Sequence, residues 1–227
     1  SQITETGPFA EAAEKVADCV RSLRGDGHDI RYLNVGGGVG ITYHDEAPPT
    51  PAEYAGAILP CLKDLGCTLV FEPGRVISGN AGIMVTRVLY GKENEEKRFV
   101  IIDAGMNDLI RPALYQAYQG VRAVEEAVQS RPRRKIDLVG PVCESGDYLA
   151  KDRELPELKR DDLLAIMSSG AYGFTMASNY NSRPRPAEIL VHGNDYHIIR
   201  ERESYADLIR GETIPAFITG ESDRDGR

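Results

Sequence analysis

Glu72 and Arg75 follow closely after the apolar run of residues 68–70, and three consecutive glycines at 36–38 follow another apolar run at 32–35. Glycine amides can point at an anion without side chains in the way, and an arginine adds a permanently charged fork for phosphate or carboxylate. A glutamate beside such a site is unfavourable unless it pairs with a cation, either Arg75 or a protonated ring nitrogen of a ligand. These residues predict an anion site; the alternative is a flexible glycine loop and a simple turn.

Both stretches are predicted to be strand ends, joined by a helix. Thr50, Pro51 and Glu53 form a capping box with proline at the first helical position, and apolar residues continue at helical spacing to Gly66. The strands of such a βαβ unit run parallel, so the glycines and Glu72 should emerge at the same carboxyl-end face. Ligands bind at that face in open sheets and in (β/α) barrels.

The chain changes character near residue 83. Before it, residues 8–24 show the spacing of an amphipathic helix, and after it the pattern is typical of strands separated by turns. The expected strands cover residues 84–90, 99–103, 136–143, 163–168, 188–192 and 196–200, and the expected helices residues 108–119 and 204–210. We therefore expect an α/β domain over residues 1–83, a mostly β domain over 84–215 and a polar tail over 216–227.

Composition narrows the class of function. The chain has 227 residues, with 27 Lys and Arg against 35 Asp and Glu, so its formal net charge is -8. This charge argues against nucleic acid or an anionic membrane surface as the main partner and favours a small substrate. No apolar run reaches the ~20 residues of a membrane span and the first residues lack signal-peptide features, so we expect a cytoplasmic protein. The cysteines and histidines show no metal-binding spacing, and we expect no metal site.

Several motifs occur in order along the chain, at residues 34–40, 72–75, 103–108, 110–115, 140–147 and 170–173. Together they resemble the group IV pyridoxal phosphate-dependent decarboxylases on the alanine-racemase-like barrel, and within them the diaminopimelate decarboxylase branch. The resemblance runs from the first residues to about residue 215. It implies the last βα units of a (β/α)8 barrel that binds pyridoxal 5'-phosphate, followed by a mostly β carboxyl-terminal domain. The implied reaction converts meso-2,6-diaminopimelate to L-lysine and CO2.

The resemblance also implies which residues hold the cofactor. They are Gly36, Gly37, Gly38, Glu72, Gly74, Arg75 and Tyr172. The glycines and Arg75 are implied to hold the phosphate, and Glu72 to pair with the ring nitrogen. A carboxylate there keeps the ring protonated, and a protonated ring is an electron sink for the electron pair left when CO2 departs.

For the substrate, the resemblance implies contacts from Arg75, Arg111, Tyr115, Glu144 and Tyr172. Arg111 and Tyr115 are four residues apart, hence on one helix face, and are implied to clamp a distal carboxylate; otherwise they are a surface arginine over an aromatic ring. Glu144 is implied to contact the distal amino group.

Cys143 is the implied proton donor. A thiol suits that role because a pKa of ~8.5 leaves it mostly protonated at neutral pH, yet able to give up the proton. Without the resemblance, a lone cysteine is most often a small buried apolar group. The resemblance further implies a homodimer with shared active sites, in which the loop of Cys143 reaches the partner's site.

One departure from the family concerns the Schiff-base lysine, which the family has in the first barrel strands, and a histidine that stacks on the cofactor ring; neither has a match in this chain. We therefore expect the chain to be the carboxyl-terminal portion of a longer enzyme and inactive alone. One alternative is a related decarboxylase for ornithine, arginine or carboxynorspermidine; Glu144, Arg111 and Tyr115 argue against the first two, which lack a distal carboxylate. Another is a non-catalytic homologue that acts as a binding module, which would have no need of Cys143.

Overall fold

The computed structural model describes residues 2–219, and these divide into two compact units, the first ending at Met176 and the second beginning at Ala177. The first unit contains two separate hydrophobic clusters. One is built from residues between 3 and 76 and the other from residues between 84 and 166. The domain boundary near residue 83 stays a prediction.

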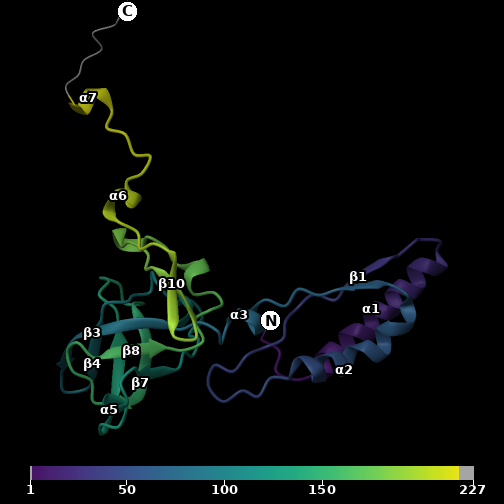
Figure 1. Cartoon of the computed structure of the whole chain (residues 1–227), viewed down its shortest axis with the longest axis horizontal. Coiled ribbons are helices and arrows are strands. Elements are labelled where there is room, and N and C mark those ends of the chain that lie inside the picture. Colours follow the sequence, from purple (N-terminus) through teal and green to yellow (C-terminus); the bar gives the residue numbers. More distant parts are fainter. Residues whose placement is uncertain (1, 220–227) are drawn as a thin grey trace, which may run out of the picture. The chain divides into compact units, whose positions relative to one another are not determined.

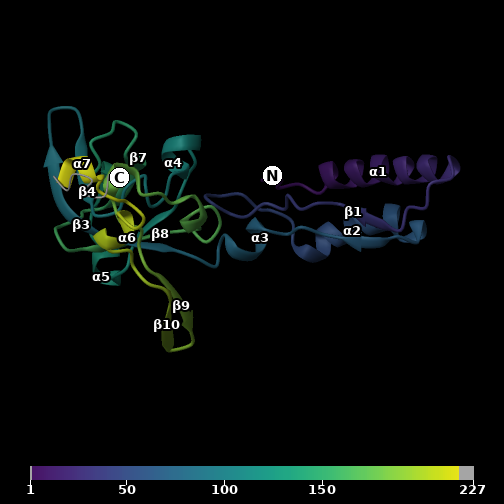
Figure 2. The same ribbon diagram turned by 90° about the horizontal axis from the view of Figure 1, so that it is seen from above.

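A parallel βαβ unit forms the first part of unit one. Its elements, with a preceding helix, are α1 (Gly7–Gly25), β1 (Tyr32–Asn34), α2 (Pro51–Leu62), the 3-10 turn η1 (Lys63–Leu65) and β2 (Thr68–Val70). As predicted, β1 and β2 pair in parallel, with Leu33 opposite Leu69. The predicted capping box also forms, with Thr50 Oγ1 accepting from the Glu53 amide at 3.2 Å. Helices α1 and α2 lie side by side (Figures 1 and 2).

The rest of unit one is a six-stranded sheet. In chain order its strands are β3 (Met84–Glu93), β4 (Arg98–Ile102), β5 (Val121–Ala123), β6 (Arg133–Val139), β7 (Tyr148–Pro156) and β8 (Leu163–Ile166). In space the order is β5-β8-β3-β4-β6-β7, and all neighbours run antiparallel except β4 and β6. The edge strands β5 and β7 also contact each other, so the sheet curls almost into a barrel.

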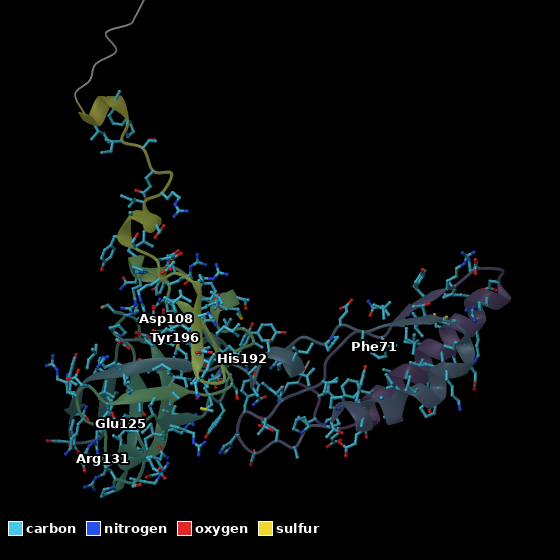
Figure 3. The ribbon with its side chains drawn as sticks, in the orientation of Figure 1. Phe71, Asp108, Glu125, Arg131, His192 and Tyr196 are labelled. Atoms are coloured by element: carbon cyan, nitrogen blue, oxygen red, sulfur yellow. The ribbon has the colours of Figure 1, made fainter. Side chains whose placement is uncertain are left out.

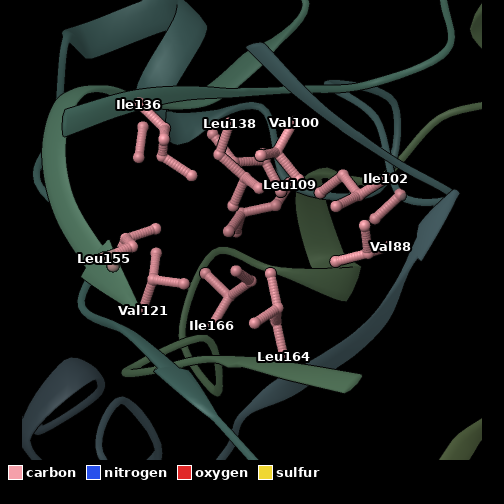
Figure 4. Packing of buried hydrophobic residues seen from close by; sticks show 13 residues of the cluster. Val88, Val100, Ile102, Leu109, Val121, Ile136, Leu138, Leu155, Leu164 and Ile166 are labelled. Carbon is pink, nitrogen blue, oxygen red and sulfur yellow. The ribbon is translucent and has the colours of Figure 1, made fainter. Parts of the chain in front are cut away.

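The interior of this sheet is apolar. Figure 4 shows inward side chains from most of its strands meeting in one cluster, among them Val88, Ile102, Leu138 and Ile166. Each of these four is at most 1% exposed. Burying such a side chain stabilises the fold by about 1.5–3 kcal/mol. The other helical segments of unit one are α3 (Arg75–Ser78), α4 (Arg111–Tyr115), α5 (Glu126–Gln129) and the 3-10 turn η2 (Phe174–Met176). Of these, α4 contacts β7 and α5 contacts β5.

Several predicted bounds were wrong. The hairpin of β3 and β4 forms, but β3 runs on to Glu93, so the turn is shorter than expected. The strand expected over 136–143 ends at Val139, because beyond it the backbone amide of Val142 donates to the Asp147 carboxylate rather than to a strand. The helix expected over 108–119 is only α4, which stops where Gln116 adopts a left-handed φ of 51°.

Unit two is small. Its elements are the 3-10 turn η3 (Tyr180–Ser182), β9 (Glu188–His192), β10 (Asp195–Arg200), α6 (Tyr205–Leu208) and α7 (Ala216–Thr219). Strands β9 and β10 were both predicted, and they pair as an antiparallel hairpin that carries His192 and Tyr196 (Figure 3). Residues 220–227 of the expected polar tail lie outside the described residues. Within residues 2–219, no helix has both the length and the apolar character that crossing a membrane requires.

Candidate active site

The ends of β1 and β2 meet at one face, as predicted. The Glu72 amide donates to the Gly36 carbonyl at 2.7 Å, and the Asn34 side-chain amide donates to Glu72 Oε1 at 2.6 Å. Asn34 Oδ1 in turn accepts from the Gly36 amide at 2.7 Å. A Cβ on Gly37 would stand 2.2 Å from the Glu72 carbonyl oxygen, so only glycine fits there. Asn34, which sequence reasoning did not single out, fixes the direction of the Glu72 carboxylate.

This face presents both hydrogen-bond donors and a negative charge. Among the described residues, no group accepts a hydrogen bond from the amides of Gly37 and Gly38, and no cation forms an ion pair with the exposed Glu72. Of the two cations that the sequence offered for Glu72, Arg75 is therefore not the one it contacts. A ligand with an anionic group and a protonated ring nitrogen fits these donors and this acceptor.

An apolar pocket of about 360 Å³ lies beside the glycines. Its lining includes Gly36, Gly37, Tyr54, Phe71 (labelled in Figure 3) and Val76. Arg75 is not part of this lining, although it begins α3 directly after Gly74.

Arg75 instead lines a second pocket, of about 420 Å³. The other lining residues are Arg111, Tyr115, Tyr172 and Met176. The structure thus brings together four of the predicted substrate contacts from three separate segments of the chain. Arg111 and Tyr115 share helix α4, as the spacing predicted.

Both guanidinium groups in this pocket stack on the same two tyrosine rings. The Arg111 guanidinium carbon lies 4.6 Å from the Tyr43 ring centre and 5.9 Å from that of Tyr172, and the Arg75 carbon lies 5.7 and 4.9 Å from them. Arg75 Nη1 also donates to the Tyr43 hydroxyl at 3.2 Å. Tyr43 is buried and was missed from the sequence, where it is one tyrosine in a loop after the glycines.

The pocket has an excess of positive charge. In the described part of the chain, no carboxylate forms an ion pair with Arg75 or Arg111. Burial, together with the neighbouring charge of Arg75, lowers the pKa of Arg111, and Arg75 Nε is buried with no hydrogen-bond partner. Two cations that share a pocket without a counterion are unfavourable by themselves, so the arrangement is suited to an anionic ligand.

Tight backbone contacts hold Tyr172 against the arginines. The Ser169 amide donates to the Gly82 carbonyl at 2.8 Å and the Gly170 amide to the Gly79 carbonyl at 3.1 Å. A Cβ on Gly170 would lie 1.9 Å from the Ser78 carbonyl oxygen, so a side chain there would push the segments apart. Tyr172 itself has a φ of 60°, a strained conformation of the kind found at ligand sites.

Cys143 and Glu144 lie elsewhere, on the loop between β6 and β7. Both are exposed, and neither lines the two-arginine pocket. Asp147, which is 4% exposed, anchors this loop by accepting from the amides of Met106 and Val142, each at 2.6 Å. The exposure of Cys143 does not fit a small buried apolar group.

Other candidate chemistry is limited in residues 2–219. There, no cluster of three or more His, Cys, Asp or Glu side chains could hold a metal ion. In unit two, the side-chain amide of Asn179 donates to Glu203 at 2.6 Å, and Arg185 forms an ion pair with the same carboxylate.

Comparison with known proteins identifies the family. The family model described as "Pyridoxal-dependent decarboxylase, C-terminal sheet domain" matches residues 16–170. The chain belongs to this family. It is similar to the diaminopimelate decarboxylases of Pseudomonas aeruginosa and Vibrio cholerae, at 52% and 51% identity over 94% of the chain and 51% of each relative. The chain spans about half the length of the curated relatives it matches.

Solved structures of the decarboxylase family agree with this family assignment. The chain superposes on diaminopimelate decarboxylase from Helicobacter pylori complexed with L-lysine, with a TM-score of 0.86 and 45% identity, over 92% of this chain and 52% of that one. The architecture is therefore that of a fragment of a (β/α) barrel followed by a sheet domain.

Proposed function

We propose that this chain is part of a longer pyridoxal phosphate-dependent enzyme that converts meso-2,6-diaminopimelate to L-lysine and CO2. The paired guanidiniums of Arg75 and Arg111, with no counter-carboxylate among the described residues, are the observation that carries the proposal. Diaminopimelate has two carboxylates and keeps one after decarboxylation, so a permanent clamp can hold it. Ornithine and arginine have only the carboxylate that leaves. The relatives' names and their lysine complex support the same substrate.

The strand-end face is the proposed cofactor site. The amides of Gly37 and Gly38, from which no described residue accepts a hydrogen bond, would take the phosphate together with Gly74, and Glu72, oriented by Asn34, would hold the proton on the ring nitrogen. When bound, pyridoxal phosphate supplies the electron sink that receives the electron pair of the breaking C–CO2 bond. Tyr172 would border both the cofactor and the substrate.

The Cys143 thiol would deliver a proton to the carbon that loses CO2, and Glu144 would receive the distal amino group. Since neither lines the pocket of Arg75 and Arg111, we propose a homodimer in which this loop enters the partner's site. A cytoplasmic location is part of the proposal, supported by four cysteines that are all free thiols.

Arg111→Ala in the complete enzyme tests the function. Removal of a charge-assisted pair should weaken diaminopimelate binding by ~1.5–3 kcal/mol, about 10- to 150-fold in KM, with pyridoxal phosphate affinity unchanged. Arg153→Ala is the matched control, because Arg153 is also desolvated and stacks on a ring, Tyr118, at 3.5 Å, outside the pocket. A wild-type enzyme that prefers ornithine, arginine or carboxynorspermidine in a CO2-release assay would overturn the assigned substrate.

A further inference from the structure

The amide of Gln119 stands between the sheet and the two-arginine pocket. Gln119 is fully buried, at 0% exposure, just before β5. In the orientation that satisfies both ends of its amide, the NH2 group donates to the Met167 carbonyl at 2.7 Å and the oxygen accepts from Arg111 Nε at 3.2 Å. We propose that Gln119 is a positioning residue that sets the direction of the Arg111 guanidinium, and with it the enzyme's selectivity for ligands that keep a carboxylate. This inference rests on the proposed function.

The geometry explains how one amide can do this. A guanidinium is planar and has five N–H donors in a fixed fork. Gln119 takes the donor on Nε, and the Tyr43 ring lies against the group at 4.6 Å. One hydrogen bond in the plane and one ring on its face together fix the rotation and the tilt of the fork. The terminal N–H groups, to which no described residue is hydrogen-bonded, are then left to the ligand.

The neutrality of the amide is as important as its position. A carboxylate at this place would hold Arg111 more strongly, but it would also cancel the charge that the pocket offers to an anion. Gln119 holds the cation without neutralising it. Its other end is tied to the carbonyl of Met167, whose own amide donates to Gly120 at 2.8 Å, so the support is part of the sheet backbone.

The test compares two ligands that differ only in a carboxylate: L-lysine and 1,5-diaminopentane, each measured as an inhibitor of the complete enzyme with pyridoxal phosphate bound. Gln119→Met keeps the length and apolar volume of the side chain but removes both hydrogen bonds. We expect it to raise the Ki of L-lysine and the KM of diaminopimelate about 10-fold or more, with the Ki of 1,5-diaminopentane and the cofactor affinity unchanged. The matched control is Gln129→Met, which removes the side-chain oxygen that accepts a hydrogen bond from the backbone amide of Ala123 in the same sheet; it should leave all four values unchanged.

A second variant, Gln119→Glu, tests the same proposal through the pH dependence of ligand binding. It is nearly isosteric with the wild type, so it can replace Gln119→Met if that variant does not fold. Its carboxyl group resembles the amide when protonated and neutralises Arg111 when ionised. The loss of L-lysine affinity should therefore grow as the pH rises, with no such trend for 1,5-diaminopentane. An equal loss for both ligands, or no loss for either, would overturn the positioning role. A wild-type enzyme that does not discriminate the two ligands would instead overturn the proposed substrate clamp.

Discussion

Arg111 and Tyr43 are far apart in the sequence, yet the Arg111 guanidinium carbon lies 4.6 Å from the Tyr43 ring centre. Tyr43 follows the glycine loop of the βαβ unit, and Arg111 begins α4 beside the sheet. The same ring lies 5.7 Å from Arg75. One aromatic side chain therefore supports both cations of the proposed substrate clamp, and links its geometry to the strand ends of the proposed cofactor site.

Substitutions at Tyr43 should separate its two contributions. Tyr43→Leu removes the ring that both cations share, and we expect KM for diaminopimelate to rise about 10-fold, equivalent to ~1.4 kcal/mol, within the range for a desolvated cation–π contact. Tyr43→Phe keeps the ring and loses only the hydroxyl that accepts from Arg75, so its effect should be smaller. Steady-state kinetics in the complete enzyme gives both values. Equal effects of the two variants would show that the hydroxyl, and not the ring, is what holds the arginines.

Gly170 is expected to be sensitive to the smallest possible side chain. A Cβ there would lie 1.9 Å from the Ser78 carbonyl oxygen, so Gly170→Ala should destabilise the protein by about 1–3 kcal/mol and move Tyr172 from Arg75. The control is Gly56→Ala in α2, where an added Cβ meets nothing within 4 Å; it should stabilise by up to ~1 kcal/mol. Urea unfolding midpoints measure both. If the two variants shift the midpoint in the same direction, the contact of residues 78–82 with Gly170 is not as tight as the structure has it.

Acid should weaken the ion pair of Glu203 and Arg185 in unit two. The pKa of Glu203 is lowered from 4.5 to about 2, mainly by the hydrogen bond from the Arg185 side chain and further by those from the Arg185 backbone amide and from Asn179. Because the folded value lies below the ordinary one, this carboxylate stabilises the unit above about pH 4.5, and the contribution is lost as the pH falls toward 2. The carboxyl-carbon NMR shift of Glu203 reports the titration directly. A midpoint near 4.5 would show that the ion pair does not form in solution.

The local parts of the fold could be predicted from the sequence. The capping box at Thr50 and the apolar runs around it are short-range signals, and the βαβ unit follows from them. Strand β7 was missed because charged residues at 151–154 interrupt its apolar pattern. It is a strand because β6 pairs with it along most of its length, and a contact of that kind is not encoded in local periodicity.

The residues of the candidate site also divide into those that the sequence indicated and those that it did not. Glu72, Arg75 and the glycines stand at strand ends, where type and spacing are informative, and the resemblance added Arg111 and Tyr115. Tyr43 and Gln119 were missed because each acts through a neighbour that is distant in sequence. Asn34 offered a signal, since an amide directly before a glycine run can bond the turn, but its hydrogen bond to Glu72 depends on the pairing of β1 with β2.

The exposed loop of Cys143 leads to a prediction about assembly. The pocket of Arg75 and Arg111 lacks Cys143 and Glu144 in its lining, although the proposed reaction needs all of them at one substrate. In a symmetric dimer, each site can take Glu72 and Arg75 from one subunit and the loop of Cys143 from the other. The complete variants Glu72→Ala and Cys143→Ala should each be nearly inactive when pure, because each spoils both sites of its own homodimer.

Mixing the two variants should restore activity. A heterodimer has one site with both substitutions and one with neither, and random exchange makes half of all dimers mixed, so about a quarter of wild-type activity is expected. Native mass spectrometry checks that the subunits exchange. The control is a mixture of Glu72→Ala with Cys19→Ala, which alters an exposed cysteine on α1. It shows the effect of exchange with a subunit whose Cys143 loop is intact. If exchange is complete and the Glu72→Ala and Cys143→Ala mixture stays as inactive as either parent, Cys143 serves the site of its own chain. The loop would then have to move toward Arg111 within one subunit, and the shared-site proposal would be wrong.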